Sequence, residues 1–259
     1  MRIHRTLIPA VALAVLPLSG AHAGLTGASV GAGLWSQDPR GHVESDGNRA
    51  DVEDDLQIGS ETGYFVWADL RHRVPILPRL KLQYTPINLT GSGTVDGSSS
   101  FEFGGGEFGF TQSEDVDSEI ELDQTDIVFY WTPWSLMFDL DVGLNIKYID
   151  GFVEVESQDD PDNRERVSFS GPLPLAYART EFRLPGTGFF GGGEGSFLGY
   201  DGHRIVDLTL RGGYRTTYGV ASLAVEGGWK YQNIRLDDFD DMDADVTVEG
   251  PYIGASVRF

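Results

Sequence analysis

Charged side chains recur at every second position in several segments, and their types and spacing could support chemistry. In the segment 136–148, Asp139, Asp141 and Lys147 fall on one face because strand side chains alternate between two faces. If such segments close into a barrel, these faces line the lumen, where opposite charges pair or border a polar pathway. The inward candidates form a nearly balanced set: Asp69, Arg71, Lys81, Asp139, Asp141, Lys147, Arg179, Asp207, Arg211, Glu226 and Lys230. We expect an ion-paired lumen, with a narrow, weakly cation-selective channel as the alternative.

A second candidate site is an acidic run near the C-terminus. It contains Asp237, Asp238, Asp240, Asp241, Asp243 and Asp245. Carboxylate oxygens at this density could loosely bind Ca²⁺ or Mg²⁺, although no glycine follows at the position that an EF-hand loop requires. The alternative is a solvated acidic rim that divalent cations bridge to lipopolysaccharide. We expect no other cofactor.

Catalytic histidines are few. Of five histidines, His4 and His22 precede the mature chain predicted below, and His72 is expected near the periplasmic end. His42 and His203 are expected at the outer rim. His203 with Asp201 is a weak basis for a rim hydrolase, and the chain holds no HExxH or P-loop motif. The sequence therefore favours a protein that is not an enzyme.

The segment that must position the central charges is 136–148. Its second face is apolar throughout, from Leu136 to Tyr148. Ordinary strands run about 5–6 residues, whereas a strand that crosses a membrane needs about 9–11. This strand has the length and the two-faced character of a membrane barrel.

Ten segments carry strand patterns of this kind, and their connections alternate in character. The segments are about 24–36, 61–74, 79–92, 117–132, 136–156, 165–184, 189–200, 203–216, 219–237 and 243–259. Short connections without acidic residues alternate with acidic ones, as in outer-membrane barrels that have short periplasmic turns and longer outer loops. We predict an all-β, antiparallel, up-and-down transmembrane β-barrel with ten strands. The Gly-rich segment 189–200 could instead be a loop, which leaves eight strands as the alternative, and 118–131 changes phase as if it held a bulge.

The two termini fit export and membrane assembly. Residues 1–23 read as a cleaved signal peptide of the Sec type, with a basic start, a short apolar run and Ala21-His22-Ala23. Residues 24–259 then form a single barrel domain. The chain has no cysteine, and its net charge of −21 argues against nucleic acid as a partner.

The C-terminal residues carry a resemblance to a known family. Alternating apolar residues lead to a terminal Phe259, similar to the assembly signal that the barrel-assembly machinery reads in outer-membrane proteins. The acidic run followed by V-T-V-E-G-P-Y-I-G-A resembles a family of small proteobacterial outer-membrane β-barrels named for a Gly-Gly motif. That resemblance implies fold and location, and no activity. We expect a monomer in the Gram-negative outer membrane, in contact with its lipid and lipopolysaccharide, with a structural or surface-interaction role.

Overall fold

The structure, a computed structural model, describes residues 25–45, 48–52, 58–95, 100–103, 106–109, 114–158, 164–239 and 242–259. The predicted signal peptide over 1–23 lies outside these residues. Within the described ranges no helix has the length and apolar character needed to span a membrane.

The chain forms a closed antiparallel barrel of ten strands, which confirms the predicted fold class. Each strand pairs with its neighbours in sequence order, and β13 returns to pair with β1 through Val30 and Val257. The wall strands are β1 (Leu25–Ser45), β3 (Glu61–His72), β4 (Arg79–Val95), β7 (Glu114–Ser135), β8 (Phe138–Ser157), β9 (Arg164–Arg183), β10 (Phe189–Tyr200), β11 (His203–Tyr218), β12 (Ala221–Phe239) and β13 (Met242–Arg258).

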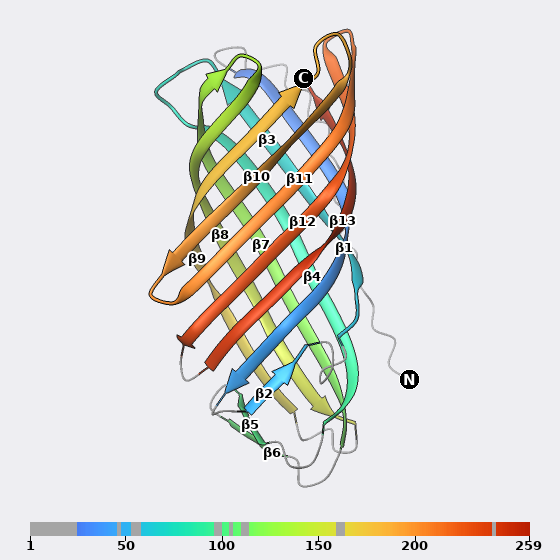
Figure 1. Cartoon of the computed structure of the whole chain (residues 1–259), viewed down its shortest axis with the longest axis vertical. Helices are drawn as coiled ribbons and strands as arrows, with labels where there is room; N and C mark the ends of the chain where they lie inside the picture. Colours follow the sequence, from blue (N-terminus) through green and yellow to red (C-terminus); the bar gives the residue numbers. More distant parts are fainter. Residues whose placement is uncertain are drawn as a thin grey trace.

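Three short strands lie in the outer connections: β2 (Asn48–Asp51), β5 (Ser100–Phe103) and β6 (Gly106–Gly109). They gather at the end of the barrel opposite the C-terminus (Figure 1). The predicted ends of the strand segments 24–36 and 79–92 were wrong, because β1 continues to Ser45 and β4 to Val95.

The membrane band follows from alternation along β8. Leu140, Val142 and Leu144 face outward, and the latter two remain about 40% exposed in the isolated chain. Asp141, Asn145 and Lys147 face inward and are almost fully buried. A barrel in lipid needs this arrangement, with apolar residues facing outward and polar residues facing inward.

Beyond Tyr148 this polarity inverts. The inward residues Ile149, Leu175 and Ile205 are apolar and buried, whereas Asp123 and Asp150 face outward. The outer part of the barrel therefore stands in water around an apolar interior. This inversion explains the phase change over 118–131, and the predicted bulge there is wrong. The β7–β8 register shifts at Trp131/Trp134 instead.

The Gly-rich segment 189–200 is strand β10, which rules out the loop and the eight-stranded alternative. The β10–β11 hairpin turns at Asp201-Gly202, where both residues have positive φ angles of 49° and 85°, as a tight hairpin turn requires. It ends well short of its neighbours at the outer end (Figure 1). The β9–β10 pairing stops at Ala176, close to Pro172 and Pro174, which have no N–H to donate to a strand ladder.

Aromatic side chains mark the borders of the band. Trp131, Trp134, Tyr148, Tyr214, Tyr218 and Trp229 are exposed on the outer wall, as aromatic girdles require. Tyr130, the residue before Trp131 on β7, is fully buried and faces the lumen.

Candidate functional site

The lumen receives all eleven charged residues that the sequence assigned to an inward network. They come from β3, β4, β8, β9, β11 and β12, and they share the lumen with Asp126, Glu181 and Glu194. Their contacts form layers that follow one another from the outer to the periplasmic end. Glu226 accepts a hydrogen bond from the Tyr252 hydroxyl at 3.3 Å.

The outermost charged layer is centred on Lys147 of β8. Its ammonium lies 2.9 Å from an Asp126 oxygen on β7 and 3.2 Å from an Asp207 oxygen on β11. The amides of Gln124 and Gln232 hydrogen-bond to each other beside it, and Lys147 donates to Gln124 at 2.9 Å. The Lys147–Asp207 ion pair therefore joins strands that are not neighbours in the wall.

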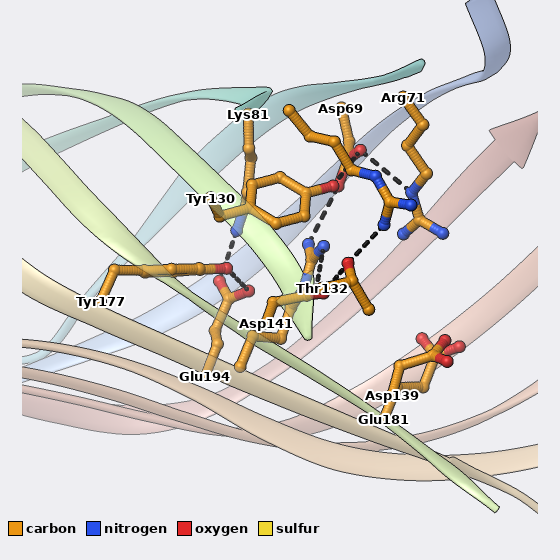
Figure 2. Close-up of polar contacts among 12 residues, drawn as sticks. Asp69, Arg71, Lys81, Tyr130, Thr132, Asp139, Asp141, Tyr177, Glu181 and Glu194 are labelled. Atoms are coloured by element: carbon orange, nitrogen blue, oxygen red, sulfur yellow. Dashed lines mark hydrogen bonds and ion pairs between the residues drawn. The ribbon is translucent and has the colours of Figure 1, made fainter. Parts of the chain in front are cut away.

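A second layer is built around Arg179 of β9. Its guanidinium lies 3.0 Å from Asp69 on β3 and 2.7 Å from Asp141 on β8, and Figure 2 shows the two carboxylates with their other partners. Asp69 also accepts the Tyr130 hydroxyl at 2.8 Å and pairs with Arg71 at 3.2 Å. Removal of Arg179 would leave the buried Asp141 carboxylate without a cation among the described residues.

Glu194 of β10 is the central lumen residue that the sequence analysis missed. Its carboxylate lies 2.5 Å from the Lys81 ammonium on β4 and accepts the Tyr177 hydroxyl at 3.3 Å (Figure 2). The residue stands alone among glycines and aromatics in F-F-G-G-G-E-G-S-F. A single carboxylate within an uncharged run was the available indication.

Lys230 of β12 is held differently from the other cations. Its ammonium lies 4.6 Å from the ring centre of Phe65, 5.6 Å from that of Trp35 and 5.7 Å from that of Tyr252. Among the described residues no carboxylate lies within ion-pair distance of it. Three ring faces attract the charge in place of a carboxylate.

The periplasmic layer is rich in arginine. Glu181 lies 3.1 Å from Arg215, 3.0 Å from Arg183 and 3.6 Å from Arg211. Arg183 also pairs with Asp139, which the sequence placed in the network. Arginines thus outnumber carboxylates at this end of the lumen.

Apolar side chains close the outer part of the lumen. Trp35, Phe65, Ile87, Leu89, Val248 and Tyr252 form a buried cluster, which Val52 and Ile58 join from the first outer connection. Within the described part of the chain, the two cavities among the charged residues have volumes of only about 60 Å³ and 40 Å³. Each has room for no more than a few water molecules.

The acidic rim is described only in part. The side chains of Asp237, Asp238, Asp240, Asp241 and Asp243 lie outside the described part, while Asp245 accepts a hydrogen bond from the Asn233 amide at 2.7 Å. Among described residues no group of three acidic or histidine side chains is arranged to hold a metal ion.

A second acidic surface lies on the outer wall of β7 and β8, where Glu119, Glu121, Asp123 and Asp150 face outward. Burial against the wall raises the pKa of the Glu121 carboxyl, and the neighbouring carboxylates Asp123 and Glu119 raise it further.

The remaining candidates lie at the two ends. His203 and Asp201 flank the β10–β11 turn, and His42 lies in β1 opposite Asp245. The last residue, Phe259, exchanges backbone hydrogen bonds with Ala28 of β1 at 2.8 and 3.2 Å. The C-terminal strand is thereby tied into the closing seam of the barrel.

The closed ten-stranded wall, its apolar band and its polar lumen define the fold of the outer-membrane β-barrel proteins. Solved structures with this fold include the outer membrane protease OmpT from Escherichia coli, at 11% identity over 91% of this chain and 97% of that chain, with a TM-score of 0.50. The transport unit of the autotransporter AIDA-I from Escherichia coli matches at 9% identity over 95% of this chain and 93% of that chain, with a TM-score of 0.42. Ail, the attachment invasion locus protein of Yersinia pestis, matches at 11% identity over 91% of this chain and 99% of that chain, with a TM-score of 0.33.

No protein-family model and no curated protein matches the chain. At 11% identity and a TM-score of 0.50, the similarity to OmpT establishes the fold alone.

Proposed function

We propose that this chain is an integral protein of the bacterial outer membrane whose barrel is filled by its own side chains. Its role is then structural or one of surface interaction, with the outer rim as the contact surface. The resemblance to the Gly-Gly family implies the same location and adds no activity. Export by a Sec signal peptide, insertion by the assembly machinery through Phe259, and a monomeric state belong to the same proposal.

The observation that carries the proposal is a set of ion pairs that cross the lumen. Lys147–Asp207, Lys81–Glu194 and Arg179–Asp69 each join strands that are not neighbours in the wall. An open pore needs a continuous water path between its walls, whereas these contacts draw the walls' side chains together. The apolar cluster at the outer end supports the same conclusion.

Single-channel conductance of the refolded mature chain in a planar bilayer tests this proposal. Folding is verified first by heat-modifiable gel mobility. We expect a folded barrel without conductance steps. Steady cation-selective steps would favour the narrow-channel alternative, and a failure to insert would overturn the membrane barrel itself.

The substitution Asp141→Asn separates the two accounts. A filled lumen should lose heat resistance, because Arg179 loses one of its two carboxylates. A channel would change its conductance with folding intact. Asp150→Asn, on the exposed outer wall, is the matched control and should alter neither property.

The proposal assigns no enzymatic activity to the rim. His203→Ala should therefore leave folding and lipid interactions unchanged. A hydrolytic activity of the wild-type protein that this substitution abolishes would contradict the proposal and favour a rim hydrolase.

A further inference from the structure

Two arginines lie opposite each other on the outer wall, where β11 and β12 leave the membrane band. Arg204 and Arg235 are direct cross-strand partners, and both side chains are exposed. Like charges placed opposite each other in a sheet destabilise it. Within the described residues neither arginine forms an ion pair, although Arg235 is also the cross-strand partner of Asp245 on β13.

Arg204 is oriented by a buried residue. Its guanidinium donates to the Asn233 amide oxygen at 3.1 Å, and Asn233 is only 2% exposed. The amide nitrogen of Asn233 is in turn fixed by Asp245 at 2.7 Å and by Thr247 at 3.0 Å. Asn233 therefore holds the Arg204 guanidinium in a fixed position on the wall. The Asp245 carboxylate contributes indirectly, because it accepts a hydrogen bond from Asn233.

An apolar groove begins directly below the two arginines. It has a volume of about 640 Å³ and runs over the outward faces of β9 to β12. Small residues on β9 and β10 form its floor and larger ones on β11 its side, so that it includes Ala176, Ala178, Gly193, Gly195, Leu208 and Leu210. Along β11 the outward residues read Arg204, Val206, Leu208 and Leu210 from the outer end inward, and therefore the arginine and the groove are continuous.

A comparable groove elsewhere on the wall lacks the cations. It has about 740 Å³ and lies over β12, β13, β1, β3, β4 and β7. Towards its outer end the same strands carry Asp38, Asp123 and Glu249, and Arg40 there is already paired with Asp38 and Glu249. Among the described residues, the groove on β9 to β12 is therefore the one of these two grooves that adjoins positive charge outside an ion pair.

We propose that this wall binds one phosphorylated glycolipid of the outer leaflet, of the lipid A type. Its phosphate lies between Arg204 and Arg235, and one acyl chain occupies the groove between Ala178 and Leu210. Guanidinium groups suit this ligand because their planar donors match phosphate oxygens. This inference rests on the proposed membrane insertion, and it differs from the acidic rim because no divalent cation is required.

The test is a titration of the refolded, detergent-solubilised mature chain with bis-phosphorylated lipid A, followed by native mass spectrometry. Folding of every sample is verified beforehand by heat-modifiable mobility, so that a failed barrel is distinguished from a failed lipid site. We expect one bound lipid, and for Arg204→Gln/Arg235→Gln an affinity lower by about tenfold or more, since charge-assisted hydrogen bonds to phosphate are lost.

Matched variants separate the headgroup from the acyl chain. Arg40→Gln, which removes an exposed but paired arginine near the same interface, should bind as the wild type does. Ala178→Phe should fill the groove and weaken binding with both arginines present. Three results would overturn the inference: equal binding by the double variant, equal binding of dephosphorylated lipid A, or equal binding of phosphatidylglycerol.

Discussion

Two lysines in the lumen, Lys147 and Lys230, are buried to a similar degree but neutralised in different ways. Lys147 touches two carboxylates, whereas Lys230 is surrounded by three aromatic rings. Substitution by methionine keeps the length of the side chain and removes the charge. Lys147→Met leaves Asp126 and Asp207 buried without their cation and should lower the free energy of unfolding by about 3 kcal/mol or more. Lys230→Met keeps the aromatic packing and should change it by about 1 kcal/mol or less.

Urea unfolding in lipid vesicles, followed by tryptophan fluorescence, measures both variants. Arg40→Met, at an exposed ion pair, serves as the control and should cost about 0.5 kcal/mol. Equal losses for the two lysine variants would contradict the distinction between a paired and an aromatically held cation.

The strand β10 shows how an element can depend on glycine. A Cβ at Gly192 would collide with the backbone carbonyl of Thr180 on β9, whereas at Gly191 the nearest atom, the Arg211 carbonyl oxygen, lies 3.6 Å away. Gly192→Ala should therefore destabilise the barrel by about 1–3 kcal/mol. Gly191→Ala should be neutral or slightly stabilising, because alanine restricts the unfolded chain. The same urea titration compares these adjacent variants, and a larger loss for Gly191→Ala would refute the close approach of β9 and β10.

Sequence patterns predicted the elements where one polarity rule holds along a whole strand. In β8 the alternation from Phe138 to Tyr148 indicated both the lumen face and the lipid face. The rule fails for β7, because Ile120 and Leu122 face an apolar interior beyond the membrane while Asp126 faces the polar lumen. Glu194 was not predicted as a lumen residue for a related reason, because its glycine neighbours show no alternation of polar and apolar side chains. The cage around Lys230 combines β1, β3, β12 and β13, and no local pattern predicts such a contact.

At the scale of the whole molecule, the acidic outer wall links stability to pH. The folded-state pKa of Glu121 is raised above its ordinary value of 4.5 by burial and by Asp123 and Glu119. Between the ordinary and the raised value the folded state holds more protons than the unfolded state, so its stability falls as pH rises through that window. We expect a higher unfolding midpoint just below this window than at pH 7, and a smaller difference in Glu121→Gln.

Thermal unfolding at the two pH values, at low and high salt, measures this effect. Salt should reduce it because exposed carboxylates are screened. Glu61→Gln, an exposed carboxylate elsewhere on the rim, controls for the loss of net charge. An unchanged pH dependence in Glu121→Gln would assign the effect to other groups.

The inverted polarity of the wall also divides the five tryptophans into two optical classes. Trp131, Trp134 and Trp229 are 42–49% exposed on the lipid side, whereas Trp35 and Trp67 pack in the interior. Lipids brominated near the headgroup or near the chain end should quench only the first class, Trp131 and Trp134 from the inner leaflet and Trp229 from the outer. Leaflet-selective quenching of these intrinsic tryptophans would therefore give the depth and the orientation of the barrel in the bilayer without an added label.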